Sequence, residues 1–245
     1  MPSPMGHPED LAANAMSRSQ RLGITVTLMV TITFAYVVVG YSSMDTPLMV
    51  VPTFADAWIP FNTNWILPYI FMYVQAWVPA CAVADKRVLI RWAMAISLMY
   101  AFAIPIWVLY TVHVPRLPLV DGPFFVYLLT IIRSIDPPTN CLPSMHVAVA
   151  TLGALVTRRV DKWIGTALIA FIPFIWYSTV AVGQHWAIDG AVGLLFAGVA
   201  YSLAFKFKPL PASAFTRIER MWHTAWWGPF VFCFIGLWFR WMWFE

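Results

Sequence analysis

Two histidines in this chain of 245 residues have neighbours that could make them reactive. His185 is followed four positions later by Asp189. Residues four apart on a helix project from one face, so the Asp189 carboxylate can accept the Nδ1 proton of His185. This leaves the Nε2 atom of His185 free as a nucleophile or base. The spacing therefore predicts a histidine that one partner orients and that attacks through its other ring nitrogen.

The second histidine, His146, ends the sequence PSMH. Pro143 suits the start of a helix, Ser144 suits its cap, and the unpaired amides of a first helical turn bind anions. A phosphate held there by serine and amide donors would have His185 in line with phosphorus and His146 beside the leaving oxygen. Nucleophile, orienting group, acid and oxyanion donors are what phosphoryl transfer through a covalent intermediate requires. This chemistry needs no metal.

The elements that position these residues are predicted to be membrane helices. Hydrophobic residues make up 61% of the chain and charged residues 11%, whereas roughly a quarter of residues are charged in soluble domains. We therefore expect an all-α, polytopic integral membrane helix bundle. A span takes about 20 mostly apolar residues. The candidates cover residues 22–41, 67–85, 89–112, 144–158, 162–182 and 187–206, with a Trp-rich seventh helix at 225–244 that crosses the membrane or lies on it.

The flanking segments complete one membrane domain. Residues 1–21 are polar and are expected to form a flexible cytoplasmic tail, residues 22–206 the catalytic domain, and residues 207–245 a C-terminal tail with the Trp-rich helix. Residues 42–66 are apolar but contain three prolines, which favours a segment in the membrane interface that covers the site or guides lipid into it.

Lysine and arginine residues alternate between the two ends of the predicted spans. The connections at one end, residues 42–66, 113–143 and 183–186, contain only Arg116 and Arg133. An excess of basic residues marks cytoplasmic loops, so we expect a cytoplasmic N-terminus and place these connections outside the cell (inner) membrane. PSMH and QHWAID then lie on the same extracytoplasmic side. The net charge of +4 reflects this pattern, and no nucleic-acid partner is expected.

The two motifs, in this order and two helices apart, resemble the second and third signature motifs of the type 2 phosphatidic acid phosphatase (PAP2) superfamily, which includes the vanadium haloperoxidases. The resemblance spans roughly residues 60–206. It implies a six-helix core and assigns His185 as the nucleophile, Asp189 as its orienting group and His146 as the general acid and base. It also implies phosphate donors in Ser144 and the Met145 amide, with no cofactor.

Three departures from the family pattern concern the glycine and the cations. Met145 replaces the usual glycine of PSGH, which leaves the amide contact possible. Thr179 stands where an arginine follows the serine of the third motif, and Leu109 stands where the first motif has lysine. Only Arg116 is kept from that first motif. Because electrostatics stabilises a phosphoryl-transfer transition state, other groups must compensate, and the candidates are Arg133, Asn140 and Gln184.

Loss of these cations, together with QHWxxD, is similar to the branch that contains inositol phosphorylceramide and sphingomyelin synthases. That similarity leaves open a phosphotransferase that moves a head group to another alcohol, since a diester carries less charge than a monophosphate. The leading expectation is a lipid phosphatase acting on a lipid phosphate or pyrophosphate, with the bilayer as its surroundings and no obligatory protein partner.

Two other classes are considered. A transporter with a His/Asp relay would be expected to show paired interrupted helices in two related halves, and the sequence shows none. A metal-dependent hydrolase with His146, His185 and Asp189 as ligands lacks HExxH and leaves the Ser144 anion site without a purpose. Three cysteines without CxxC spacing exclude a disulfide framework and a cysteine-based zinc site.

Overall fold

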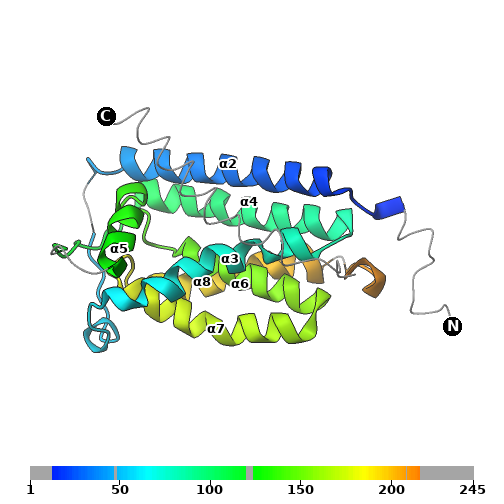
Figure 1. The fold of residues 1–245 in the computed structure, drawn as a ribbon. Helices are drawn as coiled ribbons and strands as arrows, with labels where there is room; N and C mark the ends of the chain where they lie inside the picture. Colours follow the sequence, from blue (N-terminus) through cyan, green and yellow to red (C-terminus); the bar gives the residue numbers. More distant parts are fainter. Residues whose placement is uncertain (1–12, 47–48, 120–123, 208, 216–245) are drawn as a thin grey trace.

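The computed structural model describes residues 13–46, 49–119, 124–207 and 209–215. These residues form an all-helical bundle, and no β-strand occurs among them (Figure 1). The helices are α2 (Arg18–Ser42), α3 (Ile66–Ala82), α4 (Lys86–Leu109), α5 (Phe124–Ile135), α6 (Met145–Val160), α7 (Lys162–Ala181) and α8 (Ala187–Tyr201), which a π-helical turn extends over Ser202–Lys206. Two short 3-10 helices precede α3, at Asp56–Trp58 and Thr63–Trp65, and another covers Ala212–Phe215.

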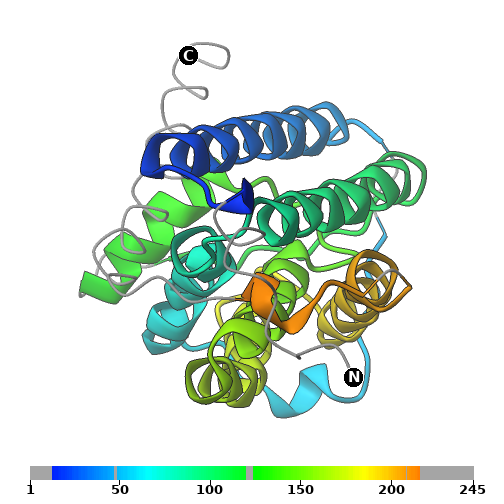
Figure 2. The same cartoon turned by 90° about the vertical axis from the view of Figure 1, so that its right-hand side faces the viewer.

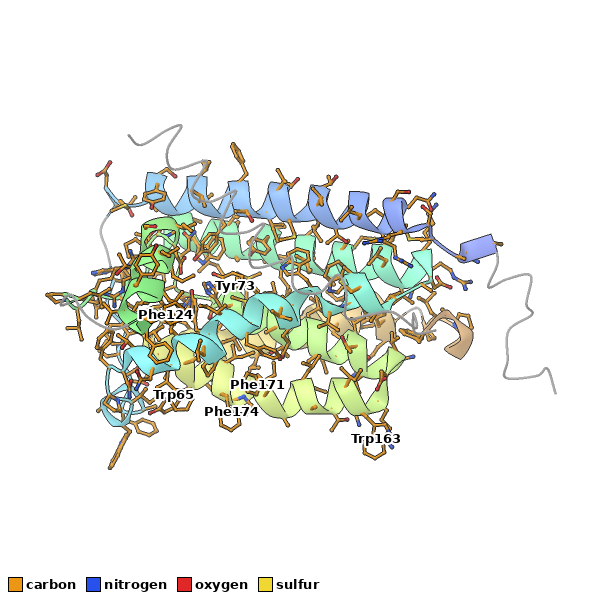
Figure 3. The ribbon with its side chains drawn as sticks, in the orientation of Figure 1. Trp65, Tyr73, Phe124, Trp163, Phe171 and Phe174 are labelled. Carbon is orange, nitrogen blue, oxygen red and sulfur yellow. The ribbon has the colours of Figure 1, made fainter. Side chains whose placement is uncertain are left out.

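Five of the helical segments are long and apolar enough to cross a membrane. They are Arg18–Ser42, Thr63–Ala82, Lys86–Leu109, Lys162–Ala181 and Ala187–Lys206. The outer face of α7 carries the large apolar side chains that a lipid-facing helix presents, with Trp163 82% and Phe174 51% exposed (Figure 3). The prediction of an all-α, polytopic membrane bundle is confirmed to this extent: the described residues are helical, and five segments could cross a membrane.

Helix α6 is the exception among the six predicted spans. It has 16 residues, fewer than the roughly 20 that a span needs, and it packs against α3, α7 and α8. The end-on view places it inside the ring of longer helices (Figure 2). Surrounding protein takes the place of lipid, so this helix can be short and can begin with a serine and a histidine inside the bundle.

Close packing of α6 against α8 depends on Gly193. A Cβ atom at this position would overlap the backbone carbonyl oxygen of Ser144, the residue before α6. Glycine lets the two backbones approach closely, as small residues do between membrane helices. Gly193 therefore fixes the distance between the helix starts that carry His146 and Asp189.

We expect Gly193→Ala to lower the melting temperature of the purified protein by about 3–10 °C, because overpacking costs about 1–3 kcal/mol. Gly198→Ala on the same helix is the matched control, since its added Cβ would meet nothing within 4 Å. Replacing a helical glycine without a clash is neutral or stabilising. Thermal unfolding in detergent measures both, and equal melting temperatures would contradict the close approach.

The segment from residue 42 to residue 66 does not span the bundle. Its two short 3-10 helices lie at the end where α2 stops and α3 starts (Figure 1). Phe54 and Trp58 are 86% and 81% exposed, as expected of an interfacial segment. The Asp56 carboxylate accepts the Ala187 amide proton at 2.7 Å. This carboxylate caps the first turn of α8, so the segment is attached beside His185.

Two boundaries differ from the sequence prediction. Helix α2 begins at Arg18, inside the predicted tail 1–21, because Ser17 and Gln20 form a capping box that starts the helix there. Residues 113–143 were expected to be a loop, but Phe124–Ile135 form α5, whose buried Leu129 and Ile132 give it an apolar face against the bundle. The predicted Trp-rich helix at 225–244 lies outside the described residues.

Candidate active site

The two histidines meet between the start of α6 and the turn before α8. His146 Nδ1 lies 2.9 Å from His185 Nε2, and the side chains are 6% and 2% exposed. Their residues are 39 positions apart in the sequence, so only the packing of α6 against α8 brings them together. The predicted convergence of PSMH and QHWAID is present in the structure.

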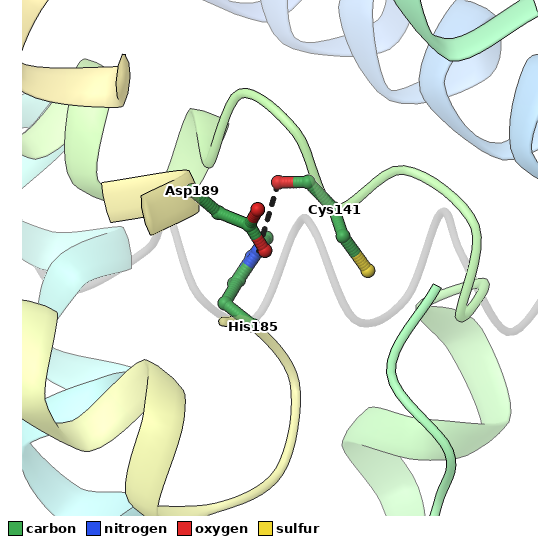
Figure 4. A group of neighbouring side chains, drawn as sticks. All are labelled: Cys141, His185 and Asp189. Atoms are coloured by element: carbon green, nitrogen blue, oxygen red, sulfur yellow. Dashed lines mark hydrogen bonds and ion pairs between the residues drawn. The ribbon is translucent and has the colours of Figure 1, made fainter. Parts of the chain in front are cut away.

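His185 is oriented from its other nitrogen by two oxygen atoms. Its Nδ1 atom lies 3.3 Å from Asp189 Oδ2 and 3.0 Å from the Cys141 backbone carbonyl (Figure 4). A carboxylate and a carbonyl oxygen both accept hydrogen bonds, so Nδ1 carries the proton and Nε2 has the lone pair. The predicted partner Asp189 is in place. The carbonyl of Cys141 is a second orienting group. Because it belongs to the backbone, a motif of side chains could not predict it.

Asp189 is fixed by the first turn of α8. Its Oδ2 atom accepts the Trp186 amide proton at 2.8 Å, while Oδ1 is buried and has no hydrogen-bond partner among the described residues. A carboxylate at a helix N-terminus is stabilised by the amides and by the helix dipole. The carboxylate is therefore held in one position toward His185.

Ser144 caps α6, as its sequence position predicts. The Val147 amide donates to Ser144 Oγ at 3.5 Å, and the Ser144 amide donates to the Asp189 carbonyl oxygen at 2.9 Å. The hydroxyl proton of Ser144 remains available as a donor. By helix geometry the amides of Met145 and His146 have no helical carbonyl to bind. This turn has the donors that an oxyanion requires, beside His185.

Arg116 and Gln184 lie next to this turn. The Arg116 guanidinium donates to the Arg133 carbonyl at 2.8 Å, to the Asp136 carbonyl and, at 3.4 Å, to Gln184 Oε1. Gln184 precedes His185, and its Nε2 atom is buried without a partner among the described residues. The arginine retained from the predicted first motif is thus brought to the histidine pair through Gln184.

Arg133 and Asn140 have contacts that fix loops. Arg133 donates to the carbonyls of Leu117 and Val182 at 2.7 and 3.2 Å. Burial and the neighbouring Arg116 charge lower the pKa of Arg133 to about 10, so it remains a cation at neutral pH. Asn140 donates to the Tyr36 carbonyl in α2 at 2.7 Å. The described contacts connect neither side chain directly to the histidines.

Sequence reasoning missed the groups on the far side of His146. Tyr69 Oη lies 2.9 Å and Tyr73 Oη 3.4 Å from His146 Nε2. Tyr69 also donates to Asp136 Oδ2 at 3.0 Å, and Tyr36 donates to Asp136 Oδ1. Asp136 could have been found from the sequence, because a carboxylate in an otherwise apolar chain suggests a functional residue. The tyrosines could not, because tyrosine is an ordinary residue of apolar helices.

Cys141, His185 and Asp189 have candidate metal-ligand atoms within 4.8 Å of one another. However, the Cys141 thiol points away from the imidazole (Figure 4) and donates to the Pro138 carbonyl at 3.1 Å. Burial raises the pKa of Cys141 well above its usual range, as do the charges of Asp189 and Asp136. Since a thiolate is the metal-binding form, these three residues fit a metal poorly.

Comparisons with protein-family models, with curated proteins and with solved structures found no match to this chain.

Proposed function

We propose that this protein is a membrane-embedded lipid phosphatase of the type 2 phosphatidic acid phosphatase kind, acting through a phosphohistidine on His185. The observation that carries the proposal is the buried array of Asp189, His185 and His146, in which an oriented nucleophile faces a second histidine. It lies at one end of a bundle of apolar helices. The phosphate of a membrane lipid also lies near the end of the membrane-spanning helices, where this array would be able to reach it.

The reaction has two steps in which atoms and charges balance. His185 Nε2 forms a bond to phosphorus, the bond from phosphorus to the leaving oxygen breaks, and His146 gives its Nδ1 proton to that oxygen. His146 Nδ1 then takes a proton from water, the water oxygen bonds to phosphorus, and the bond to His185 Nε2 breaks. Asp189 stabilises the positive charge that develops on His185 during attack.

Substrate must enter between the two histidines. Their nitrogens are 2.9 Å apart, whereas a nucleophile alone needs about 3–3.5 Å to the atom it attacks. The proposed reaction therefore requires the His185 turn to separate from α6 when substrate binds. The Ser144 hydroxyl, the Met145 amide and Arg116 would then be the donors for the phosphoryl oxygens.

A small cavity beside His146 is large enough for water. A cavity of about 40 Å³ lies between α2, α3, α4 and α6, and its lining includes Thr33, Tyr36, Tyr73 and His146. This is enough for about two waters, and the hydroxyl and imidazole groups would bind them. His185 is not part of this lining, so the cavity does not decide between water and an alcohol as the acceptor.

Transfer to an alcohol is the second candidate, because the site has few free cations. Within the described ranges, the end of the bundle that holds the histidines carries two basic side chains, Arg116 and Arg133. Both already donate to backbone carbonyls. Weak positive charge suits a phosphodiester better than a phosphate dianion, which favours a head-group transferase of the inositol phosphorylceramide or sphingomyelin synthase type as the alternative.

The charge distribution also supports an orientation. The other described lysines and arginines lie at the opposite end of the bundle, at the starts of α2, α4 and α7 and the ends of α6 and α8. Under the positive-inside rule this end faces the cytoplasm. The candidate site would then act on lipids at the extracytoplasmic face of the cell membrane.

The proposal is tested by phosphate release from purified protein in mixed micelles with EDTA, across lipid monophosphates and pyrophosphates. We expect release from at least one lipid class and none from a His185→Ala preparation. A second series supplies phospholipid donors with diacylglycerol, ceramide or inositol acceptors and is analysed for new phospholipids. New lipid without phosphate release would replace hydrolysis with transfer. If neither product forms from any lipid, the enzymatic proposal is overturned.

A further inference from the structure

A second carboxylate, Asp136, lies on the opposite side of His146 from the His185 and Asp189 pair. It follows α5 directly and is 2% exposed. Its Oδ2 atom lies 3.8 Å from His146 Nε2, with the hydroxyl of Tyr69 between them. Burying a carboxylate is costly unless donors and a positive charge compensate it. Arg116 donates to the backbone carbonyl of Asp136, whereas His146 faces its carboxylate and is able to become positive.

The hydrogen-bond roles on this side follow from a count of protons. Tyr69 has one hydroxyl proton, and an ionised Asp136 carboxylate only accepts. The proton therefore points to Asp136 Oδ2 at 3.0 Å. The Tyr69 oxygen is left as an acceptor, so the contact of 2.9 Å to His146 Nε2 requires a proton on that nitrogen.

The roles on the other side follow in the same way. His185 Nδ1 faces two acceptors, Asp189 and the Cys141 carbonyl, so its proton is on Nδ1 and its Nε2 atom accepts. The contact of 2.9 Å to His146 Nδ1 then requires a proton on that atom too. With Asp136 ionised, these contacts give His146 a proton on each nitrogen, as an imidazolium between the carboxylates of Asp136 and Asp189.

We propose that Asp136 is a positioning residue that acts through Tyr69 to keep His146 doubly protonated, with the Nδ1 proton directed to the reacting centre. Catalytic use of that proton rests on the proposed function, whereas the protonation pattern does not. In the first step the Nδ1 proton moves to the leaving oxygen as the bond from His185 to phosphorus forms. The other proton stays on Nε2, hydrogen-bonded to the Tyr69 oxygen, throughout, so Nδ1 is the nitrogen that regains a proton from water or an alcohol.

The pattern is tested without turnover by nitrogen NMR of the full chain in detergent, with ¹⁵N-labelled histidine and His146→Gln for assignment. At pH 7 both His146 nitrogens are expected at imidazolium shifts, and His185 at the shifts of a neutral ring protonated on Nδ1. In Asp136→Asn and Tyr69→Phe, His146 should become neutral. Neutral His146 in the unaltered protein, or a charged ring in both variants, would overturn the proposal.

Tyr36→Phe is the matched control. It also removes a tyrosine hydrogen bond to Asp136, but it leaves the Tyr69 link intact, so His146 should stay doubly protonated. Loss of the charge in this variant as well would show that the bridge is not the cause. Since Asp136→Asn and Tyr69→Phe change different elements, a failure of one to fold leaves the other as the test.

The kinetic consequence depends on the leaving group. If the proposed reaction occurs, Asp136→Asn should slow release of an aliphatic alcohol about 10- to 100-fold, a part of what a general acid contributes. It should slow release of 4-nitrophenolate from the matching ester less than about 3-fold, because that group needs no proton. Equal losses with both would indicate a merely structural role. Absence of turnover in the unaltered protein would reject the enzymatic proposal and leave the NMR result standing.

Discussion

His185→Ala is expected to abolish turnover, with a loss of at least about 10⁴-fold in kcat, or roughly 5.5 kcal/mol of barrier. The covalent route loses its nucleophile, and water has no oriented base at the same position. His185 is 2% exposed and makes its contacts with His146, Asp189 and the Cys141 carbonyl. The rate is measured as phosphate release under saturating lipid in mixed micelles.

His113→Ala is a control of the same residue type. His113 belongs to the same end of the bundle, and its backbone carbonyl accepts the Trp186 indole proton at 3.0 Å. Its side-chain Nδ1 atom has no partner among the described residues. This variant should keep at least half of the rate. A His185→Ala protein that elutes and melts normally and still turns over would contradict the assignment of the nucleophile.

His146→Gln is expected to show the second largest effect, and its size should depend on the leaving group. General acid catalysis contributes about 10²–10⁴-fold, so release of an aliphatic alcohol should fall by that factor. In the first turnover, an ester of the same phosphoryl group with 4-nitrophenol should release nitrophenolate within about 10-fold of the rate of the unaltered protein, because nitrophenolate leaves without a proton and the water step that uses His146 as base comes later. Both rates are measured in parallel on one preparation.

Comparison of the two esters separates chemistry from folding. A distorted site would slow both substrates together, whereas loss of an acid slows only the one with the poor leaving group. Equal losses for the two esters would therefore contradict the role of His146 as acid. Asp136→Asn should show the same selectivity in weaker form, since Asp136 acts on the His146 proton through Tyr69.

The fold was predictable where a local physical rule decides the structure. Apolar length marks the spans, and Ser144 starts α6 where a cap is expected. The start of α2 was missed, although the capping box of Ser17 and Gln20 is a local signal. Helix α5 was not predicted, because prolines and glycine on either side suggest a loop and twelve residues are too few for a span. The central place of α6 depends on close contacts such as Gly193 with Ser144, and no local pattern reports these contacts.

The candidate site divides in the same way. The contact of His185 with Asp189 was predicted from helical spacing, but α8 begins at Ala187, so His185 lies in the preceding turn and Asp189 meets it from the first turn of the helix. The contact of Tyr69 with Asp136 joins residues 67 positions apart, and the Cys141 carbonyl is a backbone group that any residue would supply. Arg116 reaches the site through Gln184, whereas Arg133 binds the carbonyls of neighbouring loops, and only the tertiary structure distinguishes the two arginines.

The central claim, a covalent bond between His185 and phosphorus, is tested most directly by trapping the intermediate. Purified protein is mixed with lipid labelled with ³²P in its phosphate, quenched in alkali within the first turnover, and digested for peptide mapping. The label is expected on the peptide that contains His185, to be stable in alkali and lost in acid, and to be absent from His185→Ala. Turnover at full rate with no labelled protein, or label at another residue, would contradict the mechanism.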